Sequence, residues 1–398
     1  MATRREASST AGVNVDPMRH SGSRLTAIAV VILLLLILAL VFTAERSFNA
    51  YRLQLVTLVA INAVIAVALT LTSGFTGVFS LGQIGFMAIG AYVGALMTIP
   101  PQWKDPMFLP GLPGWLASLD LSTWHPQLAL LVACVAGGLV AAAIAVIVGA
   151  PLMRLSGHYV AVATMGFLII VNSVATNWDT VTRGARGLSQ IPNVTNSWVA
   201  YGWMLLTVYA VWRLRISPYG RAMIASRENV IAARAVGVNV WRTRLLAFVV
   251  GAFFTGVAGS LLAHQIGTVA PNAFYFQTTF NIIIMVVLGG MGSITGAVVG
   301  AAILTLAPEY MRDLEDGVDL GVVSIGALYG ISQIILAIGF ILVMIFRPQG
   351  LFGDRELSLD RWSRSRRAAA GVEGGDAAPA PLASDAENIS SDEATQTR

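Results

Sequence analysis

The chain has 398 residues, of which 56% are apolar and 12% charged, with a formal net charge of +4 and a mean hydropathy of +0.72. A soluble domain carries about 25% charged residues, so this composition excludes an ordinary soluble protein. Uncharged apolar runs of about 20 residues recur, as helices that cross a bilayer require, and they lack the alternation of barrel strands. We therefore predict an all-α polytopic membrane protein. In this class, excess arginine marks cytoplasmic loops, so we expect no nucleic acid partner.

A basic N-terminal segment, residues 1–24, precedes the first apolar run, 25–44. A cleaved signal peptide would have a shorter apolar part and an A-x-A-like cleavage site, and the sequence "LVFTAERS" lacks that site. We therefore predict an uncleaved first span. It opens a transmembrane domain over residues 25–353, and residues 354–398 form a cytoplasmic, largely disordered tail because they show no apolar period.

About ten membrane segments are expected along the chain, with very short turns at 72–77 and 289–293. The segments 278–290 and 294–308 are short for full crossings, so a re-entrant pair remains open. Five segments precede residue 177 and five follow, which permits an inverted five-plus-five pseudo-repeat. The predicted segments are 25–44, 53–72, 76–98, 127–149, 158–176, 198–212, 245–266, 278–290, 294–308 and 325–346.

The charges between the segments alternate as the orientation rule requires. With the N-terminus inside, the inner loops are basic, and the loop 213–244 alone holds seven arginines against one acid, Glu228. The last outer loop is acidic, and residues 99–126 are rich in Pro and Trp, as suits the membrane interface. Both termini are therefore predicted to be cytoplasmic.

Several kinds of chemistry are missing from the sequence. None of the ten segments contains Asp, Glu, Lys or Arg, which proton-coupled carriers usually place there. The four histidines have no metal-ligand spacing, the single Cys134 permits no intrachain disulfide, and no phosphate-binding loop motif occurs. We therefore expect no enzyme activity, no cofactor, no metal and no catalytic residue. Uphill transport would need energy from another subunit.

A glycine-rich segment, 73–96, contains the best candidates for a polar path. Most of its glycines are expected to allow close helix packing. The alternative is a broken helix that lines a translocation path, since an unpaired polar group facing lipid is costly. The path candidates in this segment are Ser73, Thr76, Ser80 and Gln83, and two weaker candidates elsewhere are Asn172 and Asn281.

The basic loop contains two helix signals. Ser217 and Pro218 are a favourable start for one helix, and Ser226 is predicted to begin a second helix that ends at Gly237. A membrane-surface helix would need a larger apolar stripe than this loop offers. Docking into the groove of a partner is favoured, because one helix face is mostly alanine. That face comprises Arg221, Ala225, Glu228, Ala232 and Ala235.

Seven stretches in order then indicate a family. They cover most of residues 50–353 and are "SGFTGVFSLGQIGFMAIGAY", "LSGHYVAVATMGF", "NWDTVTRGARGLSQIP", "SPYGRAMIASRENVIAARAVGVN", "LLAFVVGAFFTGVAGSLLAHQIGTVAP", "VVLGGMGSITGAVVGAAIL" and "MIFRPQGLFG". The chain resembles the permease subunits of branched-chain amino acid ABC importers, of the LivM type. Two positions depart from the family pattern: Val230 replaces an acid, and Arg183 replaces a glycine.

The resemblance implies a fold, partners and a mechanism. It implies an ABC importer permease in the bacterial inner membrane that works by alternating access, with a homologous permease subunit of the LivH type, two cytoplasmic ATPase subunits and an extracytoplasmic substrate-binding protein. The matching coupling segment contains Arg221, Glu228, Asn229, Ala232, Ala233 and Gly237. Related permeases import urea, short amides or sugars, so these substrates are an alternative, and an ion-coupled secondary transporter is another.

Overall fold

The computed structural model describes residues 43, 45, 46, 49–108, 111, 113, 114, 120–155, 157–315, 331–347 and 349–353. Within these residues the regular elements are helices, and an isolated antiparallel bridge joins Leu188 to Val269. This confirms the all-helical class. The first predicted span, the C-terminal tail and most of the last outer loop lie outside the described residues.

The longer helices follow the predicted segments from 53–72 onward. They are α2 (Ala50–Leu69), α3 (Gln83–Thr98), α6 (Pro126–Leu152), α7 (His158–Asn177), α9 (Ser197–Ile216), α12 (Val240–Ile266), α13 (Phe276–Gly289), α14 (Ile294–Glu315) and α15 (Ile331–Phe346). The short elements are the π-helix η2 (Thr70–Phe75), α4 (Pro101–Met107), α8 (Asp179–Thr182), η3 (Gly184–Arg186), α10 (Pro218–Glu228), α11 (Val230–Ala235) and η4 (Pro271–Ala273).

Six helical stretches in the described part of the chain are long and apolar enough to cross a membrane, by length and composition. They are Ala50–Phe75, Pro126–Leu152, His158–Asn177, Val240–Ile266, Pro271–Gly289 and Ile294–Met311. Gln83–Thr98 and Ile334–Phe346 are apolar but shorter. The chain is therefore a multi-pass membrane protein, and the number ten remains a prediction.

Several helices extend beyond the predicted membrane segments, and helix caps explain two of the ends. The side chain of Ser217 accepts a hydrogen bond from the backbone of Gly220, so α9 continues to Ile216 and α10 starts directly after the cap. Asn239 accepts from the backbone N–H of Arg242, so α12 begins at Val240, five residues earlier than predicted. The first turn of α12 consequently carries arginine, which the predicted span excluded.

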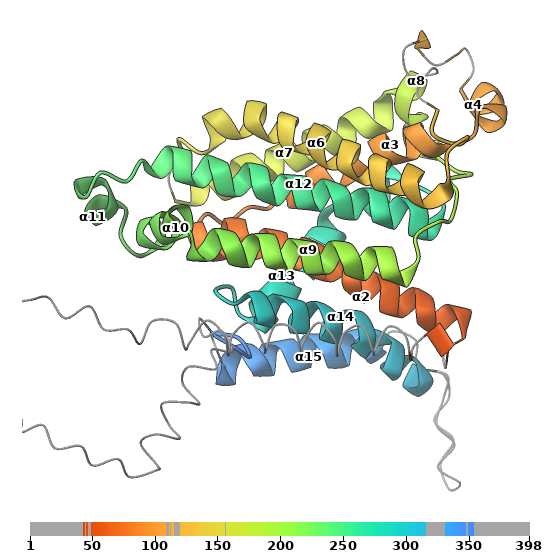
Figure 1. Cartoon of the computed structure of the whole chain (residues 1–398). Coiled ribbons are helices and arrows are strands. Elements are labelled where there is room, and N and C mark those ends of the chain that lie inside the picture. The colour runs from red at the N-terminus through yellow and green to blue at the C-terminus, as the bar shows by residue number, and fades with distance from the viewer. Residues whose placement is uncertain are drawn as a thin grey trace, which may run out of the picture. The chain divides into compact units, whose positions relative to one another are not determined.

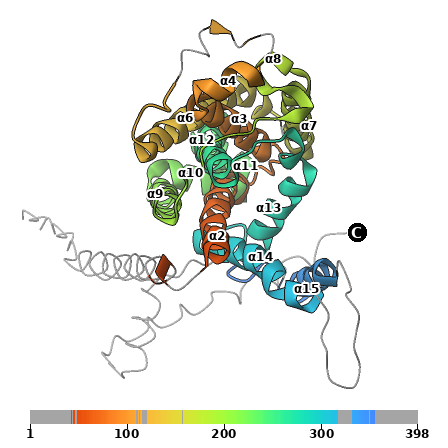
Figure 2. The ribbon, with the colours of Figure 1, turned by 90° about the vertical axis from the view of Figure 1, so that its right-hand side faces the viewer.

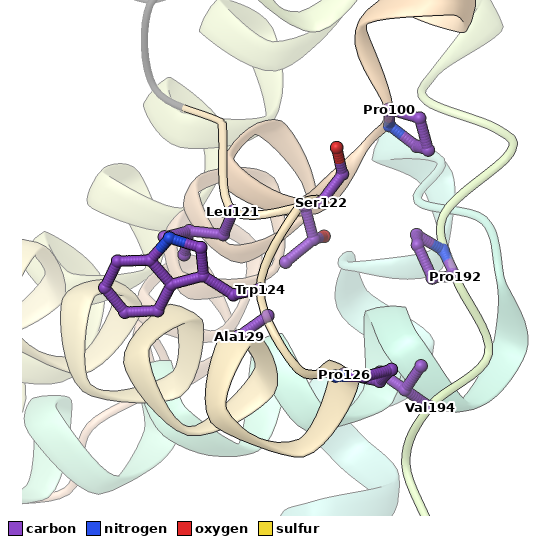
Figure 3. A pocket seen from close by; sticks show the side chains of 9 residues that line it. Pro100, Leu121, Ser122, Trp124, Pro126, Ala129, Pro192 and Val194 are labelled. Carbon is purple, nitrogen blue, oxygen red and sulfur yellow. The ribbon is translucent and has the colours of Figure 1, made fainter.

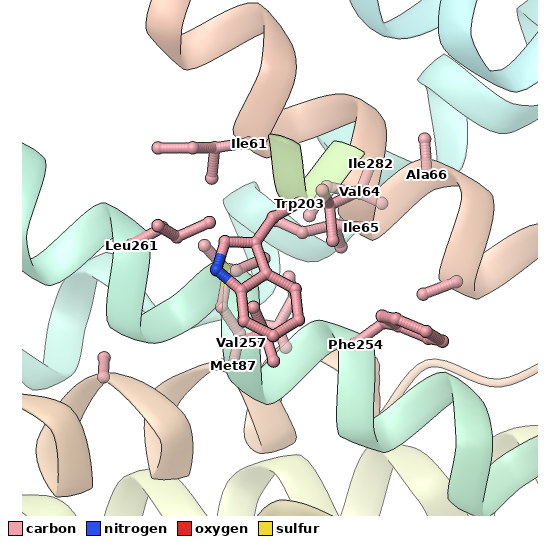
Figure 4. Close-up of a cluster of buried hydrophobic side chains, with 14 of the residues drawn as sticks. Ile61, Val64, Ile65, Ala66, Met87, Trp203, Phe254, Val257, Leu261 and Ile282 are labelled. Carbon is pink, nitrogen blue, oxygen red and sulfur yellow. The ribbon is translucent and has the colours of Figure 1, made fainter. Parts of the chain in front are cut away.

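The hydrophobic core lies where α12 packs against α2, α3 and α6. Figure 4 shows Trp203 of α9 surrounded by apolar side chains of the neighbouring helices. Because nearly every face of α2 and α12 meets another helix, both are buried, whereas α6 and α7 keep wide apolar faces outside the core for lipid. The cluster includes Ile61, Val64 and Ile65 of α2, Met87 of α3, Phe254, Val257 and Leu261 of α12, and Ile282 of α13.

Glycines let α3 and α12 approach backbone to backbone. A Cβ atom on Gly90 would overlap the backbone of Gly256, and one on Gly259 would overlap the carbonyl of Met87. A Cβ on Gly94 would likewise overlap the Ser260 side chain. These glycines therefore serve the close packing that the sequence favoured for most of the 73–96 segment.

The short helices divide between two ends of the bundle (Figure 1). α10 and α11 lie at one end of α9 and α12, and α4 and α8 lie at the other end. Figure 2 shows α2 between α12 and α14, with α6 and α7 on the far side of α12. The basic loop is thus separated from the Pro- and Trp-rich loop by the length of the bundle, as opposite membrane sides require.

Candidate functional site

A break between α2 and α3 forms the first part of the candidate site. α2 passes into the π-helix η2, Thr76 is still helical, and residues 77–82 are irregular until α3 starts at Gln83. The turn predicted at 72–77 is therefore misplaced, because the helix continues to Phe75. Gly77 has φ +68°, a left-handed conformation that favours glycine, and it turns the chain out of the helix. Short π-helices often occur at functional sites.

Hydroxyl groups partly satisfy the irregular backbone. The backbone N–H of Leu81 donates to Oγ1 of Thr164 in α7 at 3.0 Å, and that of Ser80 donates to Oγ of Ser73 at 3.4 Å. The Thr76 hydroxyl donates to the carbonyl of Thr72 at 2.6 Å. Irregular backbone at membrane depth is tolerated only where protein or water provides such partners.

Two of the predicted path residues keep polar atoms without a partner in the described part of the chain. Nε2 of Gln83 donates to Oγ1 of Thr255 in α12 at 2.7 Å, but Oε1 of Gln83 has no partner. The Ser80 hydroxyl has none either. Both side chains are buried, with exposed fractions of 2% for Gln83 and 1% for Ser80. Buried polar atoms in such a state are uncommon and call for a functional explanation.

Asn172 and Asn281, the path candidates outside the segment 73–96, lie away from the break. Nδ2 of Asn172 on α7 donates to the Pro271 carbonyl in η4 at 2.7 Å, which ties these two elements together. Asn281 is exposed on α13. Within the described residues neither forms a hydrogen bond to the break. Sequence reasoning missed Thr164 and Thr255, although hydroxyls inside predicted apolar spans were a usable signal.

The basic loop folds into two short capped helices. Asn229 accepts hydrogen bonds from the backbone N–H groups of Ile231 and Ala232 at 2.9 and 3.0 Å, and it begins α11. The prediction that Ser226 begins the second helix was wrong. Ser226 is buried inside α10 and donates its hydroxyl to the Met223 carbonyl at 2.7 Å. Since the helix stops at Asn229, the predicted alanine face is not continuous.

Exposure separates the predicted coupling residues into two groups. Ala233 is buried within the chain, so its small size serves internal packing. The exposed members are Arg221, Glu228, Asn229, Ala232 and Gly237. Gly237 has φ +84° and open space around it, so backbone conformation rather than crowding requires glycine there.

Two apolar side chains project from the same tip. Ile231 is 81% exposed and Val236 is 77% exposed, although each belongs to or follows an ordered, capped helix. Ordered apolar side chains that face solvent are available for contact with another protein. The tip formed by residues 229–237 is therefore suited to docking.

A pocket of about 110 Å³ lies at the opposite end of the bundle (Figure 3). Its lining carries no charged side chain that could hold a carboxylate or an ammonium group, and it contains none of the path candidates. Its lining residues are Thr98, Pro100, Leu121, Ser122, Trp124, Pro126, Ala129, Pro192 and Val194. No cluster of three metal-ligating side chains occurs among the described residues.

Two charged residues near this end are held in restricted environments. Lys104 on α4 is buried, which lowers the pKa of its ammonium group, while the charge of Asp120 opposes that shift. Arg183, which stands where the resembled family has glycine, has φ +64°. A left-handed conformation disfavours side chains, so the structure explains the glycine of the family pattern.

Comparison with known proteins decides the family. The family model described as "Branched-chain amino acid transport system / permease component" matches residues 51–316. The chain belongs to this permease family. No solved structure matches it.

Individual relatives of the permease support the same family. It is 31% identical to the high-affinity branched-chain amino acid transport system permease protein LivM of Escherichia coli K12, over 80% of this chain and 74% of that one. It is 26% identical to the corresponding LivH protein of E. coli K12, over 79% of this chain and 96% of the relative. The autoinducer 2 import system permease protein LsrC of Klebsiella pneumoniae is 32% identical over 36% of this chain. The permease is thus related to both kinds of branched-chain permease subunit.

Proposed function

We propose that this permease imports branched-chain amino acids as one membrane subunit of an ABC importer. The partners are a homologous permease subunit of the LivH type, two cytoplasmic ATPase subunits and an extracytoplasmic binding protein. Similarity to LivM over 80% of the chain supports the substrate class, and similarity to LivH supports a partner of the same fold. The partial match to LsrC keeps a different small solute as the alternative.

The exposed tip at residues 229–237 is the part of the chain that we assign to contact with the ATPase. Ile231 and Val236 would enter a groove of the ATPase, while Ala232 and Gly237, which directly follow them, keep the backbone accessible. Arg221 and Glu228 add charges that fix the orientation of docking. Asn229 acts through its cap, which holds α11 at a defined angle to α10.

The break between α2 and α3 is the region that we assign to the translocation path of the substrate. The substrate is a zwitterion, and no charged side chain is needed if helix ends and uncharged polar groups meet its two charges. The Ser80 hydroxyl can donate to a carboxylate near the N-terminus of α3, and Oε1 of Gln83 can accept from an ammonium group. Ser73 and Thr76 line the same break, and Asn172 and Asn281 would act at other stages of the path.

Membrane topology belongs to the same proposal. We expect ten membrane segments in an inverted five-plus-five arrangement, with both termini in the cytoplasm. Reporter fusions after Pro110 and Gln190 should report the outer side, and a fusion after Val230 the inner side. An inner-side signal after Gln190 would contradict the orientation.

The decisive experiment is reconstitution of the complex. The permease, co-expressed with its candidate partners and purified in mild detergent, should retain the ATPase and import leucine into liposomes only with ATP and binding protein. Ile231→Asp should release the ATPase, because a buried charge in an apolar contact is costly. Leu155→Asp is the matched control, since Leu155 is also exposed, at 40%, but lies in the short connection between α6 and α7, outside the predicted membrane segments. Leucine uptake without ATP would refute the proposal, and import restricted to urea or an amide would refute the substrate.

A further inference from the structure

A hydrogen bond joins the ATPase-docking helices to the break in the membrane. Arg227, in the last turn of α10, donates from Nη1 to the carbonyl of Gly74 in η2 at 2.9 Å. The arginine stem also covers the turn, because a Cβ on Gly77 would lie 3.2 Å from Cγ of Arg227. The side chain is 29% exposed, so this contact is partly shielded from solvent.

The Gly74 carbonyl is a suitable acceptor for a cation. It lies in the final residues of η2, where the helix ends and carbonyl groups lose their regular donors. Such a helix end also carries partial negative charge, which favours an arginine. A second arginine from the same loop region reinforces the contact, since the Arg215 guanidinium lies 5.4 Å from the centre of the Phe75 ring.

Gly74 is held from its other side as well. A Cβ on Gly74 would overlap the carbonyl of Met291, in the turn between α13 and α14. The carbonyl that accepts from Arg227 is therefore part of a backbone packed between two elements. These contacts connect α10 to η2, and residues 77–82 follow η2 and Thr76 directly in the chain.

We infer that Arg227 is a positioning residue that transmits displacement of α10–α11 to the break between α2 and α3. This inference rests on the proposed function, because the displacement comes from the ATPase. Arg227 itself contacts neither the substrate nor, by this assignment, the ATPase. Its bond to Gly74 makes opening of the polar break depend on the position of the docking helices.

The test separates coupling from docking and from hydrolysis. In the reconstituted complex with leucine-loaded binding protein, Arg227→Gln should keep ATPase co-purification and ATP hydrolysis, while leucine uptake per ATP falls by about tenfold. In Arg227→Lys, leucine uptake per ATP should lie between the values for Arg227→Gln and wild type, because lysine keeps the charge but lacks the planar guanidinium group. Arg242→Gln, at an exposed position of the same basic region, should match wild type.

Each other result overturns the inference. An unchanged ratio of uptake to hydrolysis in Arg227→Gln would show that the contact does not couple the two processes. Loss of the ATPase in this variant would place Arg227 in the docking surface instead. If Arg227→Gln does not insert into the membrane, the same ratio in Arg227→Lys decides. A wild-type complex without ATP-driven uptake would instead refute the proposed function.

Discussion

The contact between α3 and α12 and the break ahead of α3 adjoin each other, yet they are built in opposite ways. Along the contact, Gly90 and Gly259 bring backbone against backbone and Gly94 packs against the Ser260 side chain, so these positions leave no space for a methyl group. At the break, Ser80 and Gln83 are buried with polar atoms unpaired. Tight apolar packing resists rearrangement, whereas unpaired polar groups favour a state that offers them partners. The comparison therefore predicts that α3 and α12 move as one unit and that the break opens.

The largest effect is expected at the tight contact. Gly90→Leu would force its side chain into the backbone of Gly256 and separate α3 from α12, so we expect loss of folded protein. Gly166→Leu is the control, because α7 has open space around Gly166. Yield and monodispersity in detergent measure both variants. Equal yields would show that the contact tolerates separation.

Gln83→Leu tests the break. It removes an unpaired oxygen and one bond to Thr255, so the folded state should lose little stability while leucine uptake falls by about tenfold, because one lost hydrogen bond to the substrate costs on the order of 1.4 kcal/mol. Gln127→Leu is matched, because Oε1 of Gln127 is also unpaired but lies in α6 outside the break. Uptake and thermal unfolding are measured together, and parallel losses in both variants would contradict a specific role.

Thr164→Val should have a smaller effect. It removes the acceptor for the backbone N–H of Leu81 and should lower the free energy of unfolding by about 1–3 kcal/mol. Thr207→Val is the control, since the Thr207 hydroxyl donates to the carbonyl of Trp203 within its own helix. Thermal unfolding in detergent should show the difference, and equal shifts would mean that α7 does not support the break.

Ser80→Ala should change stability least. Its hydroxyl is buried and has no partner in the described part of the chain, so its removal breaks no bond and also removes a desolvation cost, and we expect no loss of stability. Uptake should still fall, because the substrate loses a donor. A clear loss of stability with normal uptake would place the Ser80 hydroxyl in an internal hydrogen bond and remove it from the path.

The sequence predicted the helical class and most helix positions because each span is an uncharged apolar run. Prediction from the sequence failed where the contacts that determine the structure join residues far apart in the chain. The extension of α2 as a π-helix brings Gly74 against Met291, more than 200 residues later in the chain, and no local pattern shows this. The second cap was ambiguous, since Ser226 and Asn229 are both good caps, and burial of Ser226 decides between them. Arg227 was one of seven arginines, and nothing local distinguished it.

The π-helix has one further consequence. A turn closed by i→i+5 bonds contains one more residue than an α-helical turn. If Thr70–Phe75 rewound as α-helix, one residue would pass into the irregular segment 77–82. The spacing between α2 and α3 could then widen while both helices keep their positions along their axes. The wide turn therefore holds one extra residue that could lengthen the irregular segment next to the break.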